Sequence, residues 1–104
     1  MSESREYLYQ LKPCRPDLPD TLTEREQAII GEHFAYLQQL LAAGQLILAG
    51  RTLDYDPLGL VIFRADSLEQ AQKIASDDPA VVHGVMTATV RPYAVALIEQ
   101  AHDR

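Results

Sequence analysis

The stretch QLILAGRTLDYDPLGLVIFRA, residues 45–65, decides the fold because it places two aliphatic runs on either side of a turn. The first run extends from Gln45 to Leu53, and the second extends from Gly59 to Ala65. Between the two runs, the segment DYDPLG combines Asp, Pro and Gly, which are the residues that favour tight turns. The stretch therefore predicts a β-hairpin near the middle of the chain.

A long helix is predicted before this hairpin. Apolar residues recur there at spacings of three and four residues up to Ala43, which is the periodicity of an amphipathic helix. Thr21, followed three residues later by Glu24, offers a capping box for the start of the helix. Gly44 supplies a signal for its end.

The remaining elements are a second helix and two outer strands. Ser67 and Gln70 offer a helix cap, and the apolar stripe that follows ends near Asp77. The segment at residues 5–12 alternates in the manner of a strand with two unlike faces. Residues 85–98 predict a long final strand, in which Pro92 indicates an edge position, a bulge or a bend.

The predicted order of elements is β-α-β-β-α-β, which is the ferredoxin-like arrangement of the α+β class. Two right-handed crossovers place both helices on one face of a four-stranded antiparallel sheet. The hairpin strands are apolar on both faces, because one set of residues alternates with another: Leu46, Leu48, Leu60 and Ile62 with Ile47, Ala49, Val61 and Phe63. Only one face meets the helices, so we expect a homodimer that buries the other. The alternative is a twisted monomeric sheet with scattered exposed aliphatic residues.

Composition limits the class of protein. The chain has 104 residues, of which 47% are hydrophobic, and no linker divides it, so we expect one domain over residues 1–104. A net charge of −6 without a basic stripe argues against nucleic acid as a partner. The N-terminus does not resemble a signal peptide and no run is long enough for a membrane span, so we expect a cytoplasmic protein. Cys14 is the only cysteine, which excludes an internal disulfide and a cysteine-rich metal site.

His33 is the first candidate for a functional side chain. It falls on or beside the apolar face of the first helix. A histidine at such a position is either a core residue bonded to a backbone carbonyl or a group that transfers protons in a pocket. The residues alone leave both interpretations open.

Two weaker candidates accompany His33. Arg51 follows Gly50 at the end of a predicted strand, where it would either hold an anionic group of a substrate or form a solvated salt bridge. Tyr36 lies one helical turn after His33, where it would either donate a hydrogen bond to a substrate or pack at the helix flank. No metal-ligand spacing and no glycine-rich phosphate loop is present, so we predict neither a metal nor a nucleotide cofactor.

Three segments of the sequence resemble a known family. The runs EHFAYLQQLLAAGQLILAG (32–50), SLEQAQKIASDDPAVVHGV (67–85) and VRPY (90–93) are similar to the YCII-related (YciI-like) domain family of dimeric α+β barrel proteins. The resemblance implies a fold like that of muconolactone-isomerase-like proteins. It also implies that His33 and Asp78 correspond to the family's active-site pair. This sequence has Arg51 where the commoner family pattern has proline.

Asp78 also has two interpretations. A carboxylate that accepts a hydrogen bond from one imidazole nitrogen fixes the tautomer and stabilises the imidazolium, which is the role that the pair implies. Asp78 precedes Pro79, however, and an Asp-Pro pair is equally typical of a helix N-cap with proline at the first position.

Two functional classes follow from the sequence and the resemblance. The first is a lyase or isomerase without a cofactor, of the dehydrochlorinase or muconolactone isomerase kind, that uses His33 and Asp78 on a small ring or enol substrate. The second is a non-catalytic dimeric module that binds a small molecule or another protein. The fold does not decide between them, because this architecture hosts both.

Overall fold

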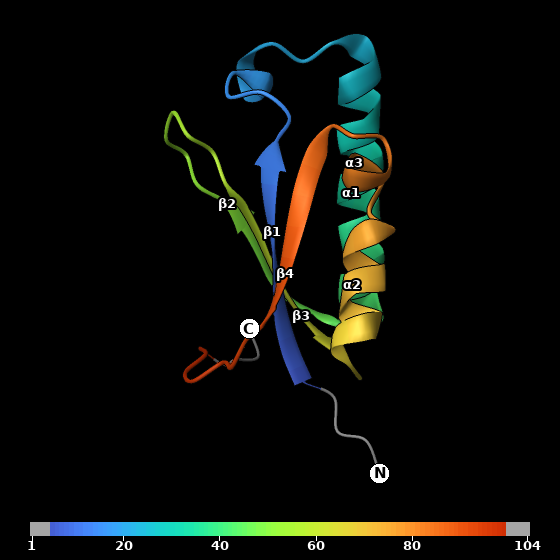
Figure 1. The fold of residues 1–104 in the computed structure, drawn as a ribbon, viewed down its shortest axis with the longest axis vertical. Helices are drawn as coiled ribbons and strands as arrows, with labels where there is room; N and C mark the ends of the chain where they lie inside the picture. Colours follow the sequence, from blue (N-terminus) through green and yellow to red (C-terminus); the bar gives the residue numbers. More distant parts are fainter. Residues whose placement is uncertain (1–4, 100–104) are drawn as a thin grey trace, which may run out of the picture.

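The computed structural model describes residues 5–99, which form an α+β fold with the predicted order of elements (Figure 1). The strands are β1 (Arg5–Pro13), β2 (Leu46–Arg51), β3 (Gly59–Ala65) and β4 (Met86–Pro92). The helices are α1 (Glu24–Ala42), α2 (Leu68–Ser76) and the short α3 (Pro79–Val82), and η1 (Leu18–Asp20) is a single 3-10 turn. The ends of the predicted domain, residues 1–4 and 100–104, lie outside the described residues.

The four strands form one antiparallel sheet in the order β2-β3-β1-β4. β1 lies at the centre, where Tyr9 pairs with Val61 of β3 on one side and with Val90 of β4 on the other. Figure 1 shows α1, α2 and α3 together on one side of the sheet. The ferredoxin-like arrangement predicted from the element order is therefore confirmed.

The core lies between this sheet and the helices. Its inward-facing strand residues alternate along each strand, as a sheet covered on one face requires. The ring of Tyr9 meets that of Phe63 edge to face, with 5.5 Å between centroids. The buried core residues of the strands and of the two longer helices are Tyr7, Tyr9, Leu11, Leu37, Leu40, Leu46, Val61, Phe63, Ala65, Ala71, Ile74 and Ala75.

The start of α1 differs from the prediction by two residues. The capping box is formed by Thr23 and Glu26: the Thr23 hydroxyl accepts from the Glu26 backbone N–H, and Glu26 accepts from the Thr23 backbone N–H. Thr21, the predicted cap, instead donates its hydroxyl to the carbonyl of Asp17 and accepts from the side chain of Arg15. At the other end, Ala43 is the C-cap and Gly44 has a φ of 77°, which a residue with a Cβ rarely adopts.

The β2 strand is shorter than predicted and contains an irregularity. Its register shifts between Leu46, opposite Phe63, and Leu48, opposite Ile62. Leu46 is consequently buried on the helix side, whereas Leu48 lies on the open face of the sheet and is 58% exposed. The expectation that Leu46 and Leu48 share a face was wrong, because the bulge interrupts the alternation.

The final strand is also shorter than predicted, since β4 ends at Pro92 and residues 93–99 have no regular structure. β4 is an edge strand, which is the first of the three alternatives (edge position, bulge or bend) that Pro92 left open. Its last contact joins the backbone N–H of Tyr93 to the carbonyl of Glu6, close to the first residue of β1. Within residues 5–99, none of the helices combines the length and apolar character that a membrane crossing requires.

Candidate active site

The structure brings His33 and Asp78 into contact although 45 residues separate them in the sequence. The Nδ1 atom of His33, on α1, lies 2.8 Å from both carboxylate oxygens of Asp78. The Asp78 side chain is fully buried, and the His33 side chain is 13% exposed. With a proton on Nδ1 the imidazole donates to Asp78, so Nε2 is the nitrogen left for a ligand.

Asp78 is positioned by the turn that joins α2 to α3. It is the N-cap of α3, where Oδ1 accepts from the backbone N–H of Ala80 at 2.9 Å and Pro79 occupies the first helical turn. Its neighbour Asp77 points outward and forms an exposed salt bridge with Lys73. The cap and the contact with His33 are therefore two roles of the same carboxylate, and the two interpretations of the Asp-Pro pair are compatible.

Tyr9 completes the set of donors around Asp78. Its hydroxyl, on the central strand β1, donates to Oδ2 of Asp78 at 2.9 Å. Burial, reinforced by the charge of Asp78, raises the pKa of Tyr9 far above its ordinary value. Tyr9 consequently remains protonated and acts as a hydrogen-bond donor.

Sequence reasoning missed Tyr9. The alternation of β1 placed Tyr9 on one face of the strand, and a buried tyrosine hydroxyl generally needs a polar partner. That signal indicates that some partner exists, but it does not identify Asp78, which is 69 residues away.

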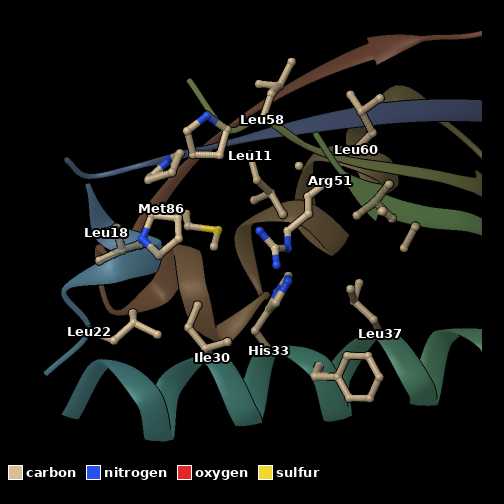
Figure 2. A pocket seen from close by; sticks show the side chains of 18 residues that line it. Leu11, Leu18, Leu22, Ile30, His33, Leu37, Arg51, Leu58, Leu60 and Met86 are labelled. Carbon is tan, nitrogen blue, oxygen red and sulfur yellow. The ribbon is translucent and has the colours of Figure 1, made fainter. Parts of the chain in front are cut away.

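His33 lines a cavity of about 420 Å³ (Figure 2). The cavity lies between α1 on one side and β2, β3 and the turn η1 on the other. The volume falls in the usual range for small-molecule sites. The walls are predominantly aliphatic, and they include side chains from the loop before α1, from α1 itself and from the strands. The apolar residues that border the cavity and are labelled in Figure 2 are Leu11, Leu18, Leu22, Ile30, Leu37, Leu58, Leu60 and Met86, of which Leu60 directs its side chain away from α1, toward the open face of the sheet.

The structure separates the two weaker candidates. Arg51, at the end of β2, lines the cavity, and its guanidinium is directed toward the imidazole of His33 (Figure 2). Tyr36 does not line the cavity: its hydroxyl donates to the backbone carbonyl of Ile74 at 2.8 Å. Burial is the main cause that raises the pKa of Tyr36 to about 12. The hydroxyl of Tyr36 is therefore engaged outside the cavity, contrary to the ligand-binding role predicted for it.

Comparison with known families gives the identity of the domain. Residues 13–93 match the YCII-related domain, which is most of the chain and includes His33, Arg51 and Asp78. The chain belongs to the YCII-related domain family. No curated protein is a significant sequence match.

A solved structure has the same fold as this YCII-related domain. It is a 5-chloro-2-hydroxyhydroquinone dehydrochlorinase (TftG) from Burkholderia phenoliruptrix AC1100, in complex with 2,5-dihydroxybenzoquinone. The TM-score is 0.65 and the sequence identity 22%, over 85% of this chain and 92% of the other. At this level of identity the likeness establishes the shared fold.

Proposed function

We propose that this YCII-related protein is a lyase or isomerase that transfers a proton on a small ring or enol substrate and needs no cofactor. The observation that carries the proposal is the position of the His33 imidazole between a buried carboxylate and an open cavity. One nitrogen is held by the buried carboxylate of Asp78, and the ring lines an apolar cavity large enough for a small molecule. A merely structural histidine has no need of an open cavity beside it.

The roles follow from the geometry. Nε2 of His33 is the proton acceptor, and later the donor, because Nδ1 faces Asp78. Asp78 holds the ring in this orientation and stabilises the imidazolium that forms when the proton arrives. Tyr9 and the backbone N–H of Ala80 keep the carboxylate in place, and neither lines the cavity.

Dehydrochlorination of a hydroxylated ring is the lyase reaction that we favour. In such a reaction a base removes a proton, the electron pair left behind forms a new double bond, and chloride leaves from the ring. An isomerase would instead return the proton to another carbon of the substrate. The shared fold with a dehydrochlorinase supports the first of these, and a single acid–base histidine suits both.

The test is an anaerobic assay of 5-chloro-2-hydroxyhydroquinone, with chloride release measured by ion chromatography. We expect His33→Ala to reduce the rate by about 100-fold or more, because a general acid–base group typically contributes that much. His83→Ala is the matched control, since His83 is exposed at the end of α3 and lies outside the cavity. This control should retain the activity of the wild type.

Two outcomes would contradict the proposal. Full turnover in His33→Ala would remove His33 from the reaction. A wild-type protein that binds small rings but neither releases chloride nor exchanges substrate protons with deuterated water would be a binding module.

A further inference from the structure

The ionisable groups that line the cavity are both basic. Of the 18 lining residues, all within the described part of the chain, only His33 and Arg51 have ionisable side chains. They come from different elements, the middle of α1 and the end of β2, and Figure 2 shows the guanidinium of Arg51 directed toward the imidazole of His33. Yet the whole chain carries a net charge of −6. The cavity is thus a basic site in an acidic protein.

The described carboxylates around these two side chains do not line the cavity. Asp78 lies behind His33, is fully buried and does not line the cavity. Asp20 and Asp54 border a neighbouring hollow of about 220 Å³, which also contacts Arg51. Within residues 5–99, however, no carboxylate forms a salt bridge with Arg51. The guanidinium therefore has donors available for a ligand.

We propose that the cavity takes a planar organic anion, with a carboxylate or ring oxyanion on Arg51 and an apolar ring packed beside His33. The inference rests on the proposed function, because it assigns the substrate class of the same site. Arg51 would fix which atom of the ring faces Nε2 of His33, so it is a specificity-determining residue.

The chemistry of the walls favours this class of ligand. A guanidinium matches two oxygens of a carboxylate, or adjacent ring oxygens, with parallel N–H donors. Aliphatic walls such as Leu11, Ile30 and Leu37 offer an apolar surface to a ring, and the exposed Arg51 offers its guanidinium to an anionic group of the same ligand. A cavity of about 420 Å³ accommodates a substituted single ring. A neutral aliphatic ligand would leave the guanidinium without a partner in the site.

The experiment measures the binding of a matched pair of probes, 4-chlorobenzoate and 4-chlorobenzamide, by NMR titration of the backbone amides. Wild-type protein should bind the anion more tightly than the neutral amide, with the largest shifts near Gly50 and His33. Arg51→Gln should weaken binding of the anion by roughly 10- to 100-fold and leave binding of the amide nearly unchanged. Arg51→Lys should restore part of the preference, because it restores the charge but not the fork of donors.

Arg91→Gln is the matched control. It removes the same charge from an exposed position on β4 that does not line the cavity, and it should keep the anion preference. The inference is overturned if wild-type protein binds neither probe, shows no preference for the anion, keeps the preference in Arg51→Gln, or loses it equally in Arg91→Gln. None of these readouts depends on turnover. An Arg51-dependent anion site with neither chloride release nor exchange of substrate protons would therefore refute the proposed reaction and leave the ligand class standing.

Discussion

The carboxylate of Asp78 is the residue on which the candidate site depends. Its two oxygens accept from the backbone N–H of Ala80, from the hydroxyl of Tyr9 and from the imidazole of His33. These groups belong to α3, β1 and α1, so one side chain joins three elements beneath the cavity. The N-cap fixes the carboxylate relative to the backbone, which makes it a rigid partner for His33.

Asp78→Asn should change the tautomer of His33. The carboxamide has only one accepting oxygen, and Tyr9 and Ala80 both present N–H or O–H donors. We expect the amide NH₂ to face His33 in a fraction of molecules, so that Nδ1 becomes the acceptor and the proton moves to Nε2. Two-bond ¹H–¹⁵N spectra of the neutral imidazole distinguish the two tautomers.

His83 provides the internal reference for these spectra, since it is exposed at the end of α3 and does not line the cavity. A His33 signal that shows the same tautomer in Asp78→Asn as in wild type would mean that Asp78 does not set the state of the ring. The positioning role in the proposed mechanism would then fail.

At this scale the sequence predicted individual residues better than their contacts. His33 was placed on the apolar side of α1 from spacing alone, and the family resemblance paired it with Asp78. Tyr9 was missed, and Tyr36 was predicted to lie in the pocket. Periodicity indicates which face of a strand or helix a tyrosine lies on, but it does not indicate which group its hydroxyl contacts. The hydroxyl of Tyr36 reaches Ile74 on α2, and only tertiary packing determines that contact.

Among the elements, α1 has the best-defined start, and that start sets the position of His33. Arg15, in the loop after β1, donates to both carboxylate oxygens of Glu26, at 2.7 and 2.8 Å, and to Thr21. The sequence offers two capping boxes, Thr21 with Glu24 and Thr23 with Glu26. Arg15 favours the second because it binds Glu26 and occupies Thr21, and this loop contact is not visible in the local pattern.

Arg15→Ala should alter how stability depends on pH. The hydrogen bonds from Arg15, followed by that from the Thr23 backbone, lower the pKa of Glu26 from 4.5 to about 2 in the folded chain. A lowered folded-state pKa contributes stability above about pH 4.5 that is lost as the pH falls toward 2. The variant should therefore be less stable than wild type at pH 7, and the difference should shrink as the pH falls through this window.

Urea denaturation at a series of pH values from 7 to 2 measures this difference. Lys73→Ala is the control, because it removes an exposed ion pair with Asp77 that should contribute on the order of 0.5 kcal/mol or less. A gap between Arg15→Ala and wild type that stays constant down to pH 2 would show that Glu26 is not stabilised as an anion by Arg15.

In the strands too, features set by the local sequence were predicted, whereas features set by pairing with another strand were not. The bounds of β3 match the predicted residues 59–65, because its aliphatic run is uninterrupted and bounded by turn residues. The bulge in β2 between Leu46 and Leu48 depends on pairing with β3, so alternation along one strand cannot reveal it.

For the whole molecule, the face of the sheet opposite the helices carries aliphatic side chains that no described element covers. Leu8, Leu48, Leu60 and Ile62 lie on it and remain partly or largely exposed in the single chain. The order of elements predicted which face the helices cover, and the two-sided apolar pattern predicted that the other needs a partner. We propose that a second copy of this chain covers it, because contiguous apolar surface of this kind is unusual on a monomer.

The prediction is a homodimer in solution. Light scattering coupled to size exclusion should give twice the chain mass of 11.6 kDa at micromolar concentration. Ile62→Glu places a charge in the middle of the open face, where burial against a partner would leave it unpaired, so it should shift the protein to monomer. Leu53→Glu is the matched control, since Leu53 is 85% exposed in the β2–β3 loop and should leave the dimer intact.

Circular dichroism separates dissociation of the dimer from unfolding of the chain. Leu48→Glu repeats the test at a position that is already 58% exposed, where the fold tolerates a charge. A wild-type mass of one chain that does not change with concentration would mean that the aliphatic residues of the open face serve only the sheet itself.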